Sequence, residues 1–183
     1  AKSTGIKHMQ EWDKYVGLNT RLAAPVDFER PAHYSRKQTR SMGRTALMAT
    51  YVTELALIDA GLLNDSCLKS GKMGIAYGSS AGSVEAVAEF GNMISTYSVN
   101  GLNATSYIRM MAHTSPVNIG LHFGINGRIY TTSSACTSGS QGIGYAYEAI
   151  KYGHQSLMVA GGAEELSACE AAVFDTLFAT STL

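Results

Sequence analysis

Three short apolar segments alternate with helix-like segments, and this alternation constrains the fold more than any other feature of the chain. The strand-like segments are KMGIAYG (72–78), RIYTTSSA (128–135) and QSLMVAGGAEEL (155–166). The segment after the first of them, SSAGSVEAVAEFGNMI, is typical of a Gly/Ser-rich turn that enters a helix. The segment after the second, TSGSQGIGYAYEAIKYG, places Ile143, Tyr147 and Ile150 on one helical face. Strands that alternate with helices predict an α/β fold with a mainly parallel, mixed sheet.

The segments before the first strand are less regular. Residues 41–60 predict a helix, because the apolar residues Leu47, Tyr51, Leu55 and Ile58 follow helical spacing, with Gly61 as its stop. Residues 1–40 are polar and aperiodic, so we expect an irregular surface segment with at most one short helix. Residues 101–125 are mixed, with a helix expected through PVNIGLHFG.

Composition narrows the class of protein. Hydrophobic residues make up 45% of the 183 residues and charged residues 15%, which indicates a globular chain. Lys plus Arg and Asp plus Glu number 14 each, so no overall charge draws the chain to nucleic acid or to an anionic membrane. No apolar run is long enough to cross a bilayer. The chain begins at Ala1, which leaves open a removed targeting segment.

The three cysteines are far apart in the sequence, at positions 67, 136 and 169. An odd number without paired spacing argues against a disulfide framework and against a zinc site, and a reducing compartment is the simplest interpretation. The five histidines form no pair with metal-ligand spacing, so we expect no metal.

Cys136 lies where a strand is expected to give way to a helix. Unpaired N–H groups at a helix start favour a thiolate and can hold the oxyanion that forms when a thioester is attacked. The small residues on both sides would let a substrate approach. A buried structural cysteine explains the same pattern, because free cysteines are often buried. Both interpretations stay open on the residues alone.

The segment GSSAG (78–82) offers a rival nucleophile, Ser80, because it matches the G-x-S-x-G turn of serine hydrolases. Such hydrolases need an acid and then a histidine downstream. The only aspartate after Ser80 is Asp175, and no histidine follows it. Glu148 followed by His154 has the required order, but both lie on or just past one expected helix. A glycine turn that packs against a neighbouring element explains the motif better.

The segment YSRKQTR carries three basic residues, Arg36, Lys37 and Arg40, before the first long helix. Such a cluster is usually a solvated surface. It is also the pattern of a docking patch for an acidic partner.

Several segments, in order along nearly the whole chain, resemble the elongating β-ketoacyl-acyl carrier protein synthase family. They are SRKQTRSMGR, GIAYGSSAGSVE, SSACTSGSQGIGYAYEAIKYG, LMVAGGAEEL and FDTLFATSTL. The cysteine segment together with the downstream AGGAEE is the most specific of these. The resemblance implies a thiolase-like fold built from two similar halves in αβαβα layers, a homodimer, no cofactor and a cytoplasmic location, with an organellar one left open.

The resemblance also implies a reaction and its residues. Cys136 matches the cysteine that takes an acyl group from acyl carrier protein, after which decarboxylation of malonyl carrier protein extends the chain by two carbons. Lys37 and Arg40 match positions that contact the carrier protein, and Ser41 departs from a further basic position. Ala81 matches a pocket-lining turn, and its small side chain predicts that medium to long acyl groups fit. Substrate-binding roles are also implied for Ser106, Tyr107 and Met110, in a segment that reaches the dimer partner's pocket.

Two features of that family are absent from residues 1–183. The opening strand should precede Ala1, and the catalytic histidines should lie in a second half beyond Leu183. We therefore expect a partial N-terminal domain whose other half is present as another chain. Two alternatives remain: a thiolase-type enzyme that acts on coenzyme A esters, and a non-catalytic domain for dimerisation or carrier-protein docking.

Overall fold

The computed structural model describes residues 3–182. The chain forms two compact units, and each is described by itself. The larger unit runs from Arg30 to Glu165, and the smaller unit combines the residues up to Glu29 with those from Leu166 onward.

A parallel three-stranded sheet forms the centre of the larger unit. Its strands are β3 (Met73–Gly78), β4 (Ile129–Thr132) and β5 (Leu157–Gly162), in the order β4-β3-β5. Ile75 of β3 pairs with Ile129 on one side and with Val159 on the other, both in parallel register. All three strands lie inside the segments expected from the sequence, so the prediction of an α/β fold with a parallel sheet is confirmed.

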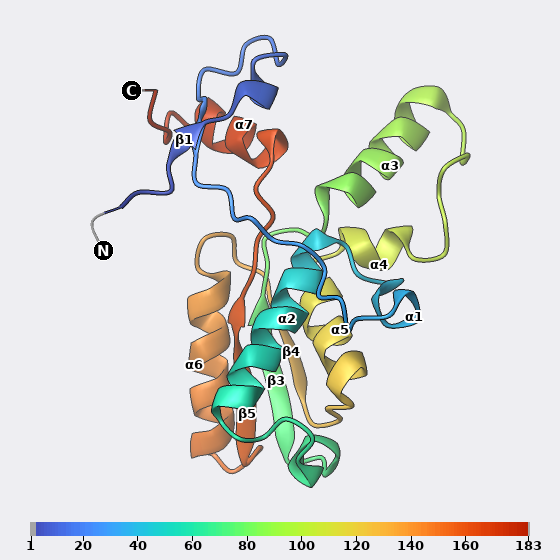
Figure 1. Ribbon diagram of the computed structural model, residues 1–183, viewed down its shortest axis with the longest axis vertical. Helices are drawn as coiled ribbons and strands as arrows, with labels where there is room; N and C mark the ends of the chain where they lie inside the picture. Colours follow the sequence, from blue (N-terminus) through green and yellow to red (C-terminus); the bar gives the residue numbers. More distant parts are fainter. Residues whose placement is uncertain (1–2, 183) are drawn as a thin grey trace. The chain divides into compact units, whose positions relative to one another are not determined.

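Side-chain size alternates along β3, and this alternation places the helices on its two faces (Figure 1). Met73, Ile75 and Tyr77 are buried in the hydrophobic core together with residues of α2 (Arg44–Asp59) and α5 (Thr114–Phe123). On the other face, Gly78 lies so close to α6 (Ser138–Lys151) that a Cβ there would be 2.5 Å from the Ser138 carbonyl oxygen. Large residues facing one layer and small residues facing the other explain how a buried central strand is covered on both sides.

Helices follow or connect the strands of the larger unit. They are α1 (Arg36–Thr39), α2 (Arg44–Asp59), α3 (Val84–Thr96), α4 (Ser106–Met110), α5 (Thr114–Phe123), α6 (Ser138–Lys151) and a 3₁₀ turn at Ser66–Lys69.

Both helices are confirmed, but the large apolar residues that share helical spacing in α2 and α6 are mostly not the residues that the structure buries. On α2, Leu55 and Ile58 are 47% and 54% exposed, and the buried positions carry mainly Ala and Thr, such as Ala46 and Ala49. On α6, the shared face of Ile143, Tyr147 and Ile150 is exposed, and the buried residues of that helix are Ser138, Gly142, Ala146 and Ala149. Close packing selects small residues here, because a Cβ on Gly142 would lie 2.7 Å from the Ala76 carbonyl oxygen.

The smaller unit pairs β1 (Lys7–His8) with β2 (Leu22–Ala23) in antiparallel fashion and contains a 3₁₀ turn (Gln10–Trp12) and α7 (Ala168–Thr176). Its core is formed by Met9, Trp12 and Leu18, against which alanines of α7 pack. The Asp175 carboxylate accepts a 2.8 Å hydrogen bond from the Asn19 N–H, and this bond lowers the pKa of Asp175. Over residues 3–182, no helix combines the length and the apolarity that crossing a membrane requires.

Burial of Tyr77 predicts a loss of stability in alkaline solution. Its pKa is raised to about 12 because burial disfavours the phenolate. The unfolded chain ionises this phenol at its ordinary pKa of about 10. The stabilising contribution is therefore complete below pH 10 and is lost as the pH rises towards about 12. We expect Tyr77→Phe to make urea unfolding less dependent on pH between 10 and 12, whereas an unchanged dependence would contradict this assignment.

Candidate active site at the carboxyl edge of the sheet

The carboxyl ends of the three parallel strands meet at one edge of the sheet. The N–H of Ala163, just after β5, donates a 3.0 Å hydrogen bond to the Gly78 carbonyl at the end of β3. The Thr132 hydroxyl at the end of β4 donates to the Ser138 carbonyl at 2.8 Å. Open α/β sheets bind ligands beyond this edge of their strands.

Cys136 lies in the tight turn that joins β4 to α6. Ala135 has a left-handed backbone, with φ of 53°, which reverses the chain direction just before the cysteine. The Thr137 N–H donates to the Ser134 carbonyl at 3.3 Å, and the Ser138 N–H donates to the Ala135 carbonyl at 3.0 Å. The Cys136 side chain is exposed, so the interpretation as a buried structural cysteine is wrong.

The hydrogen bonds of this turn modify the expectation of free N–H groups at the helix start. Those of Thr137 and Ser138 are used within the turn, so they are not available to an oxyanion. Among the described residues, the Cys136 N–H donates no hydrogen bond to another group. The Ser138 hydroxyl completes the turn, because it accepts from the Ser134 N–H at 2.9 Å and donates to the Ala135 carbonyl at 2.6 Å.

Glycines allow the neighbouring segments to pack closely against the Cys136 turn. A Cβ on Gly162 at the end of β5 would lie 3.0 Å from the Cα of Gly139, in the first turn of α6. A Cβ on Gly78 would lie 2.5 Å from both the Thr132 and the Ser138 carbonyl oxygens. The close approach of these three segments fixes the Cys136 turn against the ends of β3 and β5.

A second turn, residues 79–83, leaves the end of β3 and brings two of the expected substrate residues together. The Gly82 N–H donates to the Met110 carbonyl at 2.9 Å, which places Ala81 next to the segment of Met110. The Ser83 N–H donates to the Arg109 carbonyl at 2.7 Å. A Cβ on Gly82 would lie 2.1 Å from the Arg109 carbonyl oxygen, so glycine is required for this approach.

The other two expected substrate residues differ in exposure. Ser106 is 1% exposed, and its hydroxyl donates a short hydrogen bond to Glu89 of α3. This bond, with Arg109 at 2.7 Å contributing, lowers the pKa of Glu89. The Tyr107 side chain is 57% exposed. Ser106 therefore joins α4 to α3, whereas Tyr107 faces outward.

Lys37 and Arg40 are exposed at the short helix α1. Ser35 and Gln38 form a reciprocal capping box that starts this helix, with a 3.3 Å bond from the Gln38 N–H to the Ser35 hydroxyl. Within residues 3–182, neither Lys37 nor Arg40 forms an ion pair. Both are therefore available to an acidic partner, although no contact links them to the Cys136 turn.

The rival serine and the histidines do not form a catalytic group in the described part of the chain. Ser80 donates its N–H to Glu164 at 2.7 Å, and no histidine there hydrogen-bonds to its hydroxyl. His33 lies 3.0 Å from Glu54, and the His122 ring packs on Tyr34 with centroids 4.5 Å apart. Residues 3–182 contain no group of three or more His, Cys, Asp or Glu side chains that could hold a metal ion.

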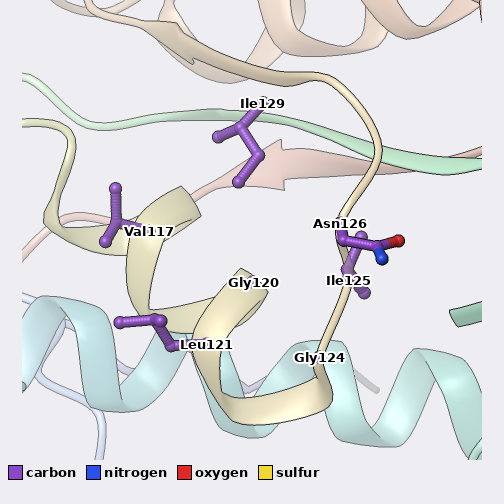
Figure 2. Close-up of a pocket in the computed structure, with 7 residues that line it drawn as sticks. All are labelled: Val117, Gly120, Leu121, Gly124, Ile125, Asn126 and Ile129. Atoms are coloured by element: carbon purple, nitrogen blue, oxygen red, sulfur yellow. The ribbon is translucent and has the colours of Figure 1, made fainter. Parts of the chain in front are cut away.

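Two cavities lie away from Cys136. One, of about 580 Å³, is lined by polar residues that include His33, Glu54 and Lys69. The other, of about 330 Å³, is an apolar hollow between α5 and β4 (Figure 2). There Ile129 of β4 points towards the turn of α5 that carries Gly120. Neither cavity is lined by any residue for which the sequence predicts a role.

The sequence predicted no role for two residues at this edge of the sheet, Glu164 and Glu165. The Glu164 carboxylate accepts from the Ser79 hydroxyl at 3.1 Å and from the Ser80 N–H at 2.7 Å. The Glu165 carboxylate accepts from the Ser83 hydroxyl at 3.0 Å. The available signal was a pair of acids directly after a strand, since such residues lie at the carboxyl edge of a parallel sheet.

Comparison with known families and sequences identifies relatives along the whole chain. The family model described as "Beta-ketoacyl synthase, N-terminal domain" matches residues 2–182. The chain is 30% identical over 188 residues to 3-oxoacyl-[acyl-carrier-protein] synthase 1 of Haemophilus influenzae, covering 100% of this chain and 45% of that protein. It is 32% identical over 182 residues to the Escherichia coli K12 protein of the same name, covering 98% and 44%. The chain thus spans less than half the length of these relatives.

Solved structures agree with this result. A β-ketoacyl synthase from Burkholderia phymatum superposes with a TM-score of 0.94 at 54% identity, over 97% of this chain and 44% of that one. A ketosynthase of a type II polyketide synthase, solved in complex with its acyl-carrier protein, gives a TM-score of 0.72 at 19% identity. It covers 85% of this chain and 45% of that one, and it shows a likeness of fold alone.

Proposed function

We propose, from the premise that this chain belongs to the β-ketoacyl synthase family as its N-terminal domain, that Cys136 is the acyl acceptor of a decarboxylative condensation. The observation that supports this role is the exposed thiol in the tight turn where the three strand ends meet. In this proposal, residues 1–183 are the first part of a ketosynthase with a thiolase-like fold.

The proposed reaction has two half-reactions. First, the Cys136 sulfur attacks the thioester carbonyl of an acyl carrier protein, and the carrier thiol leaves with a proton. Second, malonyl carrier protein loses CO₂, and its carbanion attacks the thioester on Cys136. The C–S bond breaks, the cysteine is regenerated, and a β-ketoacyl carrier protein two carbons longer is released.

The described residues indicate which steps of the reaction this domain performs. This domain binds the acyl group and holds it as a thioester. No histidine of residues 3–182 hydrogen-bonds to the Cys136 turn. We therefore assign polarisation of the malonyl group to the half of a full-length ketosynthase that follows the N-terminal domain.

The test is product formation by the protein as its natural gene encodes it. Acyl and malonyl carrier proteins should together yield CO₂ and a β-ketoacyl carrier protein in equal amounts. CO₂ release without a condensed product would contradict the proposal. Turnover with coenzyme A esters alone would favour the thiolase alternative.

The proposed partner is an acyl carrier protein, and the proposed contact is the α1 surface. Arg36, Lys37 and Arg40 are exposed together there, although the chain as a whole carries no net charge. The relatives named 3-oxoacyl-[acyl-carrier-protein] synthase 1 support this choice of partner. A local positive patch accelerates the encounter with an acidic partner and fixes its orientation.

Charge reversal at this patch should weaken carrier-protein binding more than the chemical step. We expect Lys37→Glu to raise KM for acyl carrier protein about tenfold with kcat nearly unchanged. The difference from the unmodified protein should shrink in 0.5 M salt, because exposed charges are screened. The matched control is Lys72→Glu, which reverses an exposed lysine just before β3. Equal effects of the two variants would contradict the assignment of the patch.

We also propose that two copies of the protein associate at the β4 edge of the sheet. Within residues 3–182, β4 pairs with β3 on one side only, and Ile129 on it is 43% exposed. The apolar hollow of Figure 2 continues this surface to Leu121, which is 72% exposed. An unpaired strand beside an apolar hollow favours pairing with a second strand.

A further inference from the structure

Two consecutive glutamates bracket the turn that carries Ala81. Glu164 holds the start of the turn through the Ser79 hydroxyl and the Ser80 N–H, at 3.1 Å and 2.7 Å. Glu165 holds its end through the Ser83 hydroxyl at 3.0 Å. Ala81 lies between these points. Carboxylate acceptors make hydrogen bonds about twice as strong as neutral ones, so both ends of the turn are held firmly.

The other side of the turn is held by main chain. The Gly82 and Ser83 N–H groups donate to the Met110 and Arg109 carbonyls at 2.9 Å and 2.7 Å. The Arg109 guanidinium in turn binds Glu89 of α3 at 2.7 Å. Ala81 therefore sits on a loop with anchors on two sides, and the loop cannot shift without breaking several hydrogen bonds.

The bond pattern distinguishes Glu164 and Glu165 from ordinary surface acids. Ser83 is the N-cap residue of α3, yet its hydroxyl makes no capping bond and donates to Glu165 instead. Ser79 is 2% exposed, and its hydroxyl, which has one hydrogen to donate, lies within hydrogen-bonding distance of both the Glu164 carboxylate and the Ala81 carbonyl. Both carboxylates thus bind groups of the 79–83 turn across from the end of β5.

We propose that Glu164 and Glu165 are positioning residues that hold Ala81 as a rigid wall of the acyl-binding site and thereby set its selectivity for acyl length. This inference rests on the proposed function, with Ala81 in the pocket-lining position that the resemblance to the family implies. It assigns a role in specificity to two residues that need not contact the reacting atoms. A rigid wall discriminates by length because an acyl chain that is too long cannot push the turn aside.

The first test measures the anchor itself and needs no activity. Amide hydrogen exchange at Ser80 should become about tenfold faster in Glu164→Ala, because its N–H loses a charge-assisted acceptor. Glu164→Gln should restore part of the protection, since an amide oxygen can still accept. Glu148→Gln, at an exposed position on α6, is the matched control and should leave the Ser80 rate unchanged. Unchanged exchange in Glu164→Ala would overturn the proposal whatever the protein catalyses.

The second test measures selectivity with a double-mutant cycle. Acylation of Cys136 is followed with 8-carbon and 16-carbon acyl carrier proteins. Ala81→Phe should reduce the rate with the 16-carbon group about a hundredfold relative to the 8-carbon group, because the ring narrows the site. In the Glu164→Ala/Glu165→Ala background, the same substitution should cost only about tenfold, because the freed turn moves away.

The outcomes separate the two claims. A smaller effect of Ala81→Phe in the freed background supports the positioning role. Additive effects in a protein that still acylates Cys136 overturn the positioning role and leave the proposed function standing. If Cys136 is not acylated in the unmodified protein, while the Ser80 amide is protected from hydrogen exchange, the proposed function is overturned. Any role of this turn in acyl selectivity is then overturned with it.

Discussion

Replacing Cys136 with serine is expected to lower the rate of β-ketoacyl product formation by at least about a thousandfold, without a measurable loss of stability. A serine hydroxyl at this position has no base within hydrogen-bonding distance among the described residues, whereas a thiol forms a thiolate far more readily. Because the Cys136 side chain is exposed, the substitution should change the free energy of unfolding by less than about 0.5 kcal/mol. Steady-state rates and urea unfolding of the same sample provide the two readouts.

The other two free cysteines are the controls for this result. Cys67 is partly buried, and its hydrogen bond with Asp65 raises the pKa of its thiol, so it is the weaker nucleophile. Cys169 is exposed on α7 of the smaller unit. Serine at position 67 or 169 should leave turnover within about twofold of the unmodified protein. A large loss at either position together with an active Cys136→Ser protein would contradict the assignment.

Gly78→Ala is expected to destabilise the protein strongly, because the end of β3 touches the start of α6. The added Cβ would lie 2.5 Å from two carbonyl oxygens, those of Thr132 and Ser138, and main-chain atoms cannot move aside as a flexible side chain can. We expect the free energy of unfolding to fall by about 3 kcal/mol or more. Acylation should fall as well, because displacement of Ser138 moves the Cys136 turn.

Gly144 on α6 provides a control substitution. It distinguishes the steric clash at Gly78 from the general effect of adding a methyl group to a glycine. A Cβ on Gly144 meets nothing within 4 Å. Gly144→Ala should therefore stabilise the protein by about 0.5–1 kcal/mol, since alanine is the better helix former. Urea unfolding of both variants gives the comparison. Similar effects of the two substitutions would contradict the close contact between β3 and α6.

The strand positions and the place of Cys136 could be predicted from the sequence because both depend on local patterns. Three short apolar segments that alternate with helix-like segments are typical of the strands of one parallel sheet, and the cysteine directly follows one of them. The buried faces of α2 and α6 could not be predicted in this way. Periodicity favours the largest apolar residues, whereas the distance between the layers selects Gly142, Ala146 and Ala149.

The candidate site was predictable to a similar extent. The resemblance to a family implied a pocket-lining role for Ala81 and, for Met110, a place in a segment that reaches the dimer partner's pocket. The 2.9 Å hydrogen bond from the Gly82 N–H to the Met110 carbonyl, which joins the two segments within one chain, could not be predicted. The position of Glu164 and Glu165 after a strand placed them at the carboxyl edge of the sheet, but their hydrogen-bond partners in the Ala81 turn could not be found from the sequence. Glu164 lies 84 residues beyond Ser80, and only the parallel register of β5 with β3 brings the two together.

The measurement that tests the central claim most directly is the location of the acyl group after one turnover of the first half-reaction. The protein is incubated with an acyl carrier protein in the absence of malonyl carrier protein, digested, and analysed by peptide mass spectrometry. We expect one acyl group per chain, on the peptide that contains Cys136, with Cys67 and Cys169 unmodified. Equal labelling of the three cysteines, or none, would contradict it and would favour a non-catalytic domain for docking or dimerisation.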